Sequence, residues 1–373
     1  MLINHDANPN TTDDDGSTPL HTATHRGDPD VVRVLIEHGA DPDTADYDRN
    51  TPLHTASYNG YLDVVETLIE GGADLNMVDN DWSTPLHTAS YSGHLDVVET
   101  LIEEGADLNM VDYYGSTPLH AASYNGHLDV VETLINHDAD PNTTHDDGST
   151  PLHTATYRGD PDVVRVLIEH GADPDTVDYD RNTPLHTASN NGHLDVVETL
   201  IEGGADLNMV DYYGNTPLHT ALFNGHLDVV YILINHDADP NTTHDDGSTP
   251  LHMASYRGHL DVVGALIDHG ADLNMVDNDR NTPLHAALHS GHLDVVETLI
   301  KEGADLNMTD KDLSTPLHTA SYNGHHDVVE TLIEEGADLN MVDYYDNTPL
   351  HAASYNGHHD VVQFLIGKGA DQN

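Results

Sequence analysis

The 373-residue sequence lacks cysteine and has only three lysines and one tryptophan. Without cysteine the chain has neither a disulfide framework nor a thiolate for catalysis or metal binding, which predicts an intracellular, cytoplasmic protein. No apolar run approaches the roughly 18–20 residues that a membrane-spanning helix needs. We therefore expect no association with the interior of a membrane.

Positive charge is almost as scarce. The chain has 66 acidic residues against 11 lysines and arginines, a formal net charge of −55. Nucleic-acid binding is disfavoured because phosphate neutralisation requires clustered lysine and arginine. Docking to an anionic membrane surface is disfavoured by the same sign. The charge favours a basic protein or peptide as partner. The composition also resembles that of proteins adapted to high salt.

What the sequence has in abundance is one tetrapeptide. Thr-Pro-Leu-His occurs eleven times at a constant spacing of 33 residues, beginning at Thr18 and ending with the copy at Thr348. A fixed period of this length is typical of a solenoid built from one supersecondary unit. Because each unit contacts only its neighbours, length adds units and does not enlarge a globular core.

The second copy predicts the structure of the unit. Thr51 suits a helix N-cap and Pro52 the first helical position, so we expect a helix over 52–58 that ends at Gly60. The valines and leucines of 62–70 recur on one helical face and predict a second helix. An extended loop over 73–80 then leads into the next unit.

These motifs resemble those of the ankyrin repeat. The fourth copy carries Asp112, Gly115, Thr117-Pro118-Leu119-His120, Gly126-His127 and Val130-Val131. The resemblance implies an all-α repeat solenoid of antiparallel helix pairs, with β-hairpin fingers and a concave groove. It predicts one continuous array of eleven repeats over 15–373. Residues 1–14 would end a partial repeat, because 2–10 nearly copy 134–142, and we expect the chain to be a piece of a longer protein.

Histidine and aspartate are frequent, but their repetition favours structural roles. The resemblance implies that the Thr-Pro-Leu-His histidines bind backbone groups within and between units. No histidine pair has a ligand spacing distinct from the repeat period, so we expect no metal site. No phosphate-binding loop, nucleophile elbow or Cys/His pair is present. We therefore expect no enzymatic activity and no cofactor.

The resemblance places recognition at two positions: the fourth residue after each Thr-Pro-Leu-His histidine, and the finger tip that precedes the next tetrapeptide. The first position is aromatic in eight of the eleven copies, in a chain with only 5% aromatic residues. Tyrosines suit recognition of lysine and arginine through cation–π contacts. Duplication of one ancestral tyrosine that packs between units is the alternative. The candidate binding residues are Tyr58, Tyr91, Tyr124, Tyr157, Phe223, Tyr256, Tyr322, Tyr355, Trp82, Tyr113, Tyr114, Asp81 and Asp112.

A second motif suggests a modification. Substrates of asparaginyl hydroxylase in this family have a leucine, five residues, an acidic residue, a branched apolar residue and then asparagine. The segments that match it end at Asn76, Asn109, Asn208, Asn274, Asn307 and Asn340.

We therefore expect a non-catalytic, monomeric scaffold that holds a basic segment of a partner protein in an acidic, tyrosine-rich groove. The alternative is a structural spacer within a larger protein, with no specific ligand in this segment. The near identity of 134–201 with 2–69 favours that alternative, because blocks of copied units leave few dedicated contacts.

Overall fold

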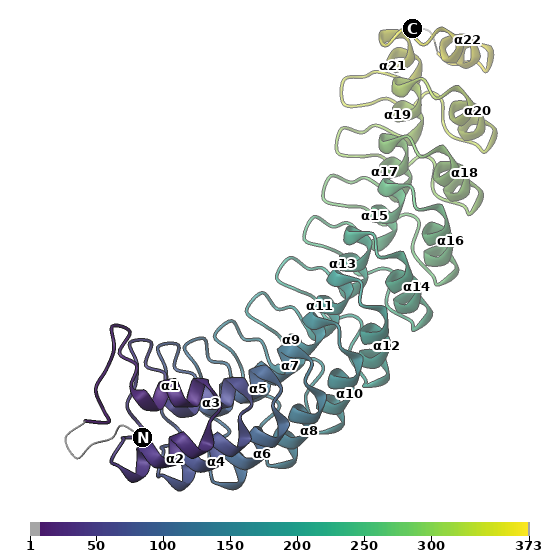
Figure 1. The fold of residues 1–373 in the computed structure, drawn as a ribbon. Helices are drawn as coiled ribbons and strands as arrows, with labels where there is room; N and C mark the ends of the chain where they lie inside the picture. The colour runs from purple at the N-terminus through teal and green to yellow at the C-terminus, as the bar shows by residue number, and fades with distance from the viewer. Residues whose placement is uncertain (1–7, 372–373) are drawn as a thin grey trace. The chain divides into compact units, whose positions relative to one another are not determined.

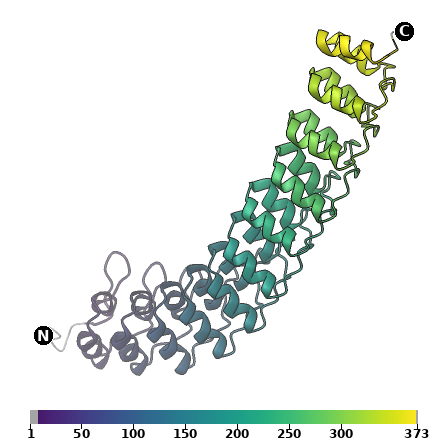
Figure 2. The same cartoon turned by 90° about the vertical axis from the view of Figure 1, so that its right-hand side faces the viewer.

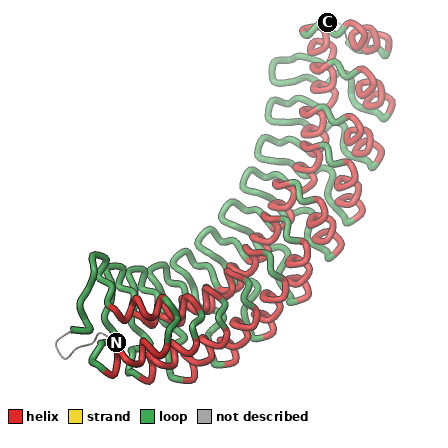
Figure 3. The backbone as a smooth tube through the Cα atoms, viewed as in Figure 1, coloured by secondary structure: helices red, strands yellow, loops and turns green. Residues whose placement is uncertain are grey.

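The computed structural model describes residues 8–371, and this part of the chain contains 22 helices and no strand (Figure 3). The helices alternate between a first and a second helix of each repeat. The first helices are α1 (Pro19–His25), α3 (Pro52–Asn59), α5 (Pro85–Ser92), α7 (Pro118–Asn125), α9 (Pro151–Arg158), α11 (Pro184–Asn191), α13 (Pro217–Asn224), α15 (Pro250–Arg257), α17 (Pro283–Ser290), α19 (Pro316–Asn323) and α21 (Pro349–Tyr355). The second helices are α2 (Pro29–Glu37), α4 (Leu62–Glu70), α6 (Leu95–Glu103), α8 (Leu128–Asn136), α10 (Pro161–Glu169), α12 (Leu194–Glu202), α14 (Leu227–Asn235), α16 (Leu260–Asp268), α18 (Leu293–Lys301), α20 (His326–Glu334) and α22 (His359–Gly367).

The chain divides into two compact units. Unit 1 comprises Met1–Ala188 and Asp195–Ala205, and unit 2 comprises Ser189–Leu194 and Asp206–Asn373. Within each unit, first helices pack on first helices and second helices on second helices, as in α3 with α5 or α14 with α16. The first helices therefore form a row between the row of second helices and the row of loops (Figure 1; the second helices of unit 2 face the reader in Figure 2).

Each first helix begins at the tetrapeptide. The Thr51 N-cap has an extended backbone, and Pro52 occupies the first helical position, where its missing N–H costs no hydrogen bond. The Nδ1 atom of His54 accepts the Thr51 backbone N–H at 3.1 Å and also lies 2.9 Å from the Thr51 hydroxyl. The predicted cap is confirmed, and the histidine, three residues into the helix, completes the capping box.

The same histidine joins neighbouring repeats. Because Nδ1 of His54 accepts a backbone N–H, its ring proton lies on Nε2, which donates to the Ser83 carbonyl of the next repeat at 3.0 Å. Burial lowers the pKa of His54, and the hydrogen bond to Ser83 opposes this shift only in part. The ring is therefore neutral at pH 7, and the predicted structural role of these histidines is confirmed.

The second helix supplies most of the core. In α4 the side chains of Val64, Val65 and Leu68 are buried, and the same three positions are buried in the other second helices of the central repeats. Full burial of each such side chain stabilises the fold by about 1.5–3 kcal/mol. The helix ends at Gly71–Gly72, where Gly72 adopts a positive φ of 88°.

The link between α3 and α4 requires glycine for two reasons. Gly60 has a φ of 70°, which L side chains rarely adopt. A Cβ atom there would also lie 2.5 Å from Nδ1 of His94, the residue that precedes α6 in the next repeat. The close approach of ring and backbone fixes where neighbouring repeats meet.

The fingers between repeats are turns held by an aspartate. In the finger before α5, Oδ1 of Asp79 accepts the backbone N–H groups of Asp81 and Ser83, each at 2.9 Å. Adjacent fingers are joined by single backbone hydrogen bonds, such as Tyr113 N–H to the Asp81 carbonyl at 2.7 Å. The predicted β-hairpin fingers are not confirmed: the bond from the Asp79 N–H to the Ser83 carbonyl at 3.1 Å closes the turn within this finger, and residues 8–371 contain no strand.

The other predictions on architecture have different outcomes. The helix pairs confirm the helical repeat stack, whereas the single continuous array over 15–373 stays a prediction. Most of the similarity between 2–10 and 134–142 falls on residues 1–7, outside the described part of the chain. Among the described helices, none is long and apolar enough to cross a membrane.

Candidate partner-binding site

The aromatic residues predicted for recognition lie at the ends of the first helices and face solvent. We call the eight residues at this position the aromatic stripe: Tyr58, Tyr91, Tyr124, Tyr157, Phe223, Tyr256, Tyr322 and Tyr355. Within unit 1 their exposed fractions lie between 47% for Tyr124 and 61% for Tyr157. About half of each side chain thus remains in solvent, where a partner can reach it.

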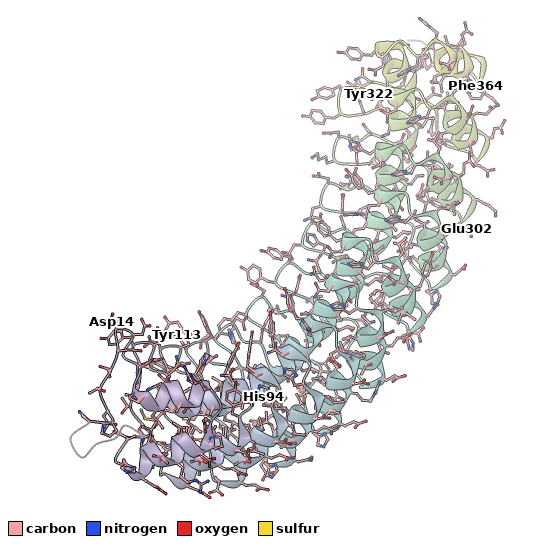
Figure 4. The ribbon with its side chains drawn as sticks, in the orientation of Figure 1. Asp14, His94, Tyr113, Glu302, Tyr322 and Phe364 are labelled. Carbon is pink, nitrogen blue, oxygen red and sulfur yellow. The ribbon has the colours of Figure 1, made fainter. Side chains whose placement is uncertain are left out.

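The backbone beneath the stripe is fixed by histidines that precede the second helices. Nε2 of His94 lies 3.0 Å from the Tyr58 carbonyl, and His127 makes the same contact with Tyr91. In unit 2, His358 bonds to the carbonyl of Tyr322 at 2.9 Å. In Figure 4, Tyr322 lies toward the loop row, whereas Glu302 and Phe364 lie toward the second helices. The rings therefore project from anchored backbone on the loop side.

In unit 1 the stripe borders a hollow, which we call the unit-1 groove. Its floor and walls come from α5, α7 and α9, the fingers between them and the start of α11. It is lined by Tyr91, Asp112, Ser116, His120, Ala121, Tyr124, His145, Asp147, Ser149, His153, Thr154, Tyr157, Asp178 and Thr187. Three stripe tyrosines and three aspartates thus meet in one hollow, and none of the described residues that line it is lysine or arginine.

Hydrogen bonds keep a groove aspartate ionised. Burial raises the pKa of Asp147, but hydrogen bonds from the Ser149 backbone N–H and hydroxyl, together with the adjacent His145, outweigh burial and leave this pKa below its usual value. The carboxylate therefore stays charged at pH 7. The buried His120 adds no opposing charge, because its pKa is lowered to about 4, first by burial and then by the neighbouring His145.

Unit 2 has a corresponding hollow, the unit-2 groove, which is lined by different side chains. It is lined by Phe223, Asp246, Ser248, His252, Met253, Tyr256, Arg257, His259, Asp277, Asp279, Asn281, His285, Ala286, His289, Asp310 and Thr319. The Arg257 guanidinium lies over the Phe223 ring, with Cζ 5.2 Å from the ring centroid. On the fingers, Nζ of Lys311 lies 3.0 Å from Oδ1 of Asp279. The chain's own cations therefore already contact a stripe ring and a finger carboxylate here.

The predicted finger residues are brought to the loop row, but their roles differ. Trp82 is half exposed and adopts a φ of 63°, at a turn position where Gly115 stands in a later repeat. An L residue there is strained by about 1–2 kcal/mol. Tyr113 and Tyr114 contact each other edge to face, and Tyr114 also stacks on His145 of the next finger.

Of the two aspartates predicted to bind the partner, one lines the unit-1 groove and the other does not. Asp112 lines the unit-1 groove, and its Oδ1 accepts the backbone N–H groups of Tyr114 and Ser116, so this aspartate also forms the turn. Asp81 is exposed on its finger and is not among the lining residues. The candidate binding residues chosen from the sequence did not include Asp147, although it stands among the finger acids, or Asp178. The repeat period could have identified Asp178, because it stands two periods after Asp112.

The asparagines of the hydroxylation motif hold neighbouring loops together. Oδ1 of Asn76 accepts the Asp107 backbone N–H of the next repeat at 2.9 Å, and Asn208, Asn274, Asn307 and Asn340 make the equivalent bond. The backbone N–H of Asn109 donates to Oδ1 of Asp107 at 2.9 Å. Hydroxylation stays a prediction, and one added oxygen on Asn76 or Asn109 in a mass spectrum would establish it.

The sequence as a whole matches a known repeat. A family model of ankyrin repeats in three copies matches 1–79, 71–145, 152–244, 218–310 and 299–373, and a second, described as ankyrin repeats in many copies, matches 125–168. The chain belongs to the ankyrin-repeat family. No curated protein matches it significantly. Ankyrin repeats are generally protein–protein interaction modules and are typically non-catalytic.

Ankyrin-repeat membership agrees with the chemistry of the two grooves. Their buried histidines are held by the capping threonines and by carbonyls of the next repeat, as His120 is by Thr117 and Ser149. Over residues 8–371, no group of three or more histidine, aspartate or glutamate side chains is placed to hold a metal ion. The grooves present exposed rings and carboxylates instead, which suit contact with a macromolecular partner.

Proposed function

We propose that this ankyrin-repeat protein is a non-catalytic scaffold that binds a basic segment of a partner protein along the unit-1 groove. The single observation that carries the proposal is the meeting of Tyr91, Tyr124 and Tyr157 with Asp112, Asp147 and Asp178 in one hollow. Half-exposed tyrosines supply rigid anchors with little entropy to lose, and the aspartates supply charge for lysine and arginine.

Two further observations support a basic partner. The net charge of −55 steers cations toward the chain from a distance. The contact of Arg257 with Phe223 is a guanidinium seated on a stripe residue. Binding by several modest contacts in successive repeats would give a total affinity that no single repeat provides.

A capture experiment with matched variants tests the proposal. In the stripe variant, Tyr58, Tyr91 and Tyr124 are changed to Asn, the residue that already occupies this position as Asn190. The control variant, Tyr61→His with Tyr231→Glu, removes two tyrosines outside the stripe and introduces the residues found one repeat away, as His94 and Glu198.

We expect wild type and the control variant to retain the same discrete basic protein at physiological salt, and the stripe variant to lose it. Equal retention by all three proteins would contradict the proposal. It would favour the structural spacer, with the stripe reduced to a duplicated packing residue.

A further inference from the structure

The spacing of the stripe in unit 1 selects a particular conformation of the bound segment. Tyr58, Tyr91, Tyr124 and Tyr157 stand at one repeat position on α3, α5, α7 and α9. These helices pack directly on one another, α3 on α5, α5 on α7 and α7 on α9. Packed helices lie about 8–10 Å apart, so a ligand must advance by about that distance between successive tyrosines.

Only some backbone conformations present the same side chain again after this distance. A polyproline II helix completes one turn in three residues and advances about 3.1 Å per residue, so every third side chain faces the same way about 9 Å further on. In a β-strand side chains alternate between two faces, and every third residue would point away from the groove. Grooves lined by aromatic rings are also the type of surface that polyproline II segments dock on.

The residues that surround each stripe position determine which side chain the ligand should carry there. The three tyrosines of the unit-1 groove share one hollow with three finger aspartates, Asp112, Asp147 and Asp178. The chain shows both contacts that a cation can make at such positions: Arg257 over Phe223 at 5.2 Å, and Lys311 to Asp279 at 3.0 Å. In unit 1 the residue equivalent to Arg257 is Arg158, and within the described residues it makes no cation–π contact with Tyr124.

We infer that the segment bound in unit 1 is a polyproline II helix with arginine or lysine at every third residue, one cation for each stripe tyrosine. This inference rests on the proposed function and specifies its ligand. Four stripe tyrosines in succession read four cations over ten residues of the ligand. A basic segment without this period would place one cation on a stripe tyrosine, and its other cations would lie between successive tyrosines.

Synthetic peptides with four arginines each test the inference against the intact chain. The first has arginine at every third position with proline and glycine between. The second has the same composition with the arginines clustered, and the third has arginine at every seventh position of a helix-forming sequence. Affinities are measured by fluorescence anisotropy at about 150 mM salt, where exposed charges beyond about 8 Å are screened.

We expect the period-three peptide to bind at least about tenfold more tightly than the clustered one, since three cation–π contacts are lost on clustering. The stripe variant, with Tyr58, Tyr91 and Tyr124 changed to Asn, should reduce the affinities to one common weak value. If all peptides bind alike to wild type and all are weakened in the stripe variant, the period is wrong while the proposed function stands. Tighter binding of the helical peptide overturns the conformation. If no peptide distinguishes wild type from the stripe variant, the proposed function itself fails.

Discussion

The unit-1 groove and the unit-2 groove are built at the same repeat positions but differ in what the chain itself places there. In unit 1 three tyrosines border the hollow, and none of the described residues that line it is lysine or arginine. In unit 2 the stripe residues Phe223 and Tyr256 line the hollow, His289 stands at the equivalent position of the next repeat, and Arg257 lies over the phenylalanine. Lys311 neutralises a finger carboxylate nearby, and the charge and hydrogen bond of Asp279 raise the pKa of that lysine.

The difference shows how a repeat array can vary recognition without changing its fold. The buried threonines, histidines, valines and leucines recur in both units, because they form the caps and the core. Exposed positions can change one at a time, since replacing a side chain there leaves the caps and the core intact. A cation of the chain at one such position, such as Arg257 over Phe223, occupies the place that a cation of the ligand would take.

The largest effect we expect is a loss of stability at low pH, and we expect it in both units. If only one unit lost stability, the two units would differ in their buried histidines as well as in their grooves. Burial lowers the pKa of Thr-Pro-Leu-His histidines in both units, among them His54 in unit 1 and His318 in unit 2, and lowers it to about 4 for His120 in unit 1 and His219 in unit 2. Below the unfolded pKa of about 6.5 the unfolded chain therefore binds more protons than the native one. Stability is complete above that pH and falls as the pH drops toward 4, by up to about 1.4 kcal/mol per pH unit for each such histidine.

Urea unfolding at about pH 7.5 and pH 5, each repeated in 1 M salt to screen the net charge, measures this loss. The free energy of unfolding should fall by several kcal/mol at the lower pH in both salts. A chain equally stable at both pH values would show that the buried histidines accept protons in the native state.

The next effect is a gain of affinity in unit 2, where the chain's own arginine covers a stripe ring. Changing Arg257 to Ala removes the internal cation over Phe223 and opens that ring to an external one. The affinity of unit 2 for an arginine-rich peptide should rise about two- to fivefold, the strength of one exposed cation–π contact. The binding is measured in a chain whose unit-1 tyrosines Tyr58, Tyr91 and Tyr124 are changed to Asn.

Arg158→Ala is the matched control, because Arg158 holds the same repeat position in unit 1 without that contact. It should change the affinity of otherwise wild-type protein by less than Arg257→Ala changes that of unit 2. Equal gains from both variants would mean that only the removal of positive charge matters.

The smallest effect we expect comes from replacing a strained finger residue by glycine, which tests stability and binding separately. Trp82 in unit 1 and Leu313 in unit 2 occupy the same turn position with φ values of 63° and 58°. Glycine relieves the strain but adds freedom to the unfolded chain, so each change to Gly should raise the unfolding free energy by at most about 1 kcal/mol. Thermal unfolding should show similar gains for both, whereas only Trp82→Gly should weaken peptide binding. Weaker binding in Leu313→Gly would locate recognition in unit 2.

Most of the fold could be predicted from the sequence because its determinants are local. Thr51, Pro52 and Gly60 mark the ends of a helix through their own backbone preferences, and the 33-residue period repeats that information. The fingers could not be predicted in the same way. Whether the two arms of a finger pair as strands depends on how many backbone hydrogen bonds follow the turn that Asp79 closes, and the repeat pattern does not contain that number.

The candidate site was predictable only in part, for a related reason. The period places Tyr91, Tyr124 and Tyr157 on one face, and the structure brings them to one hollow. The contact of Arg257 with Phe223 joins residues 34 positions apart through their side-chain conformations, and neither residue stands out in its own repeat. Asp147 lines the groove from a different repeat position than Asp112, because His145 occupies the Asp112 position in that repeat.

The most direct test of the account is a titration of one fluorescent four-arginine peptide into three proteins: wild type, a unit-1 variant with Tyr91, Tyr124 and Tyr157 changed to Asn, and a unit-2 variant with Phe223 and Tyr256 changed to Asn. The account predicts a loss of about 100-fold in the unit-1 variant, since each buried aromatic anchor contributes at least about 1 kcal/mol, and a change of less than about threefold in the unit-2 variant, whose phenylalanine is already covered by an arginine. Equal dissociation constants for all three proteins would contradict it, because the peptide would then be held by the net charge alone and not by the stripe.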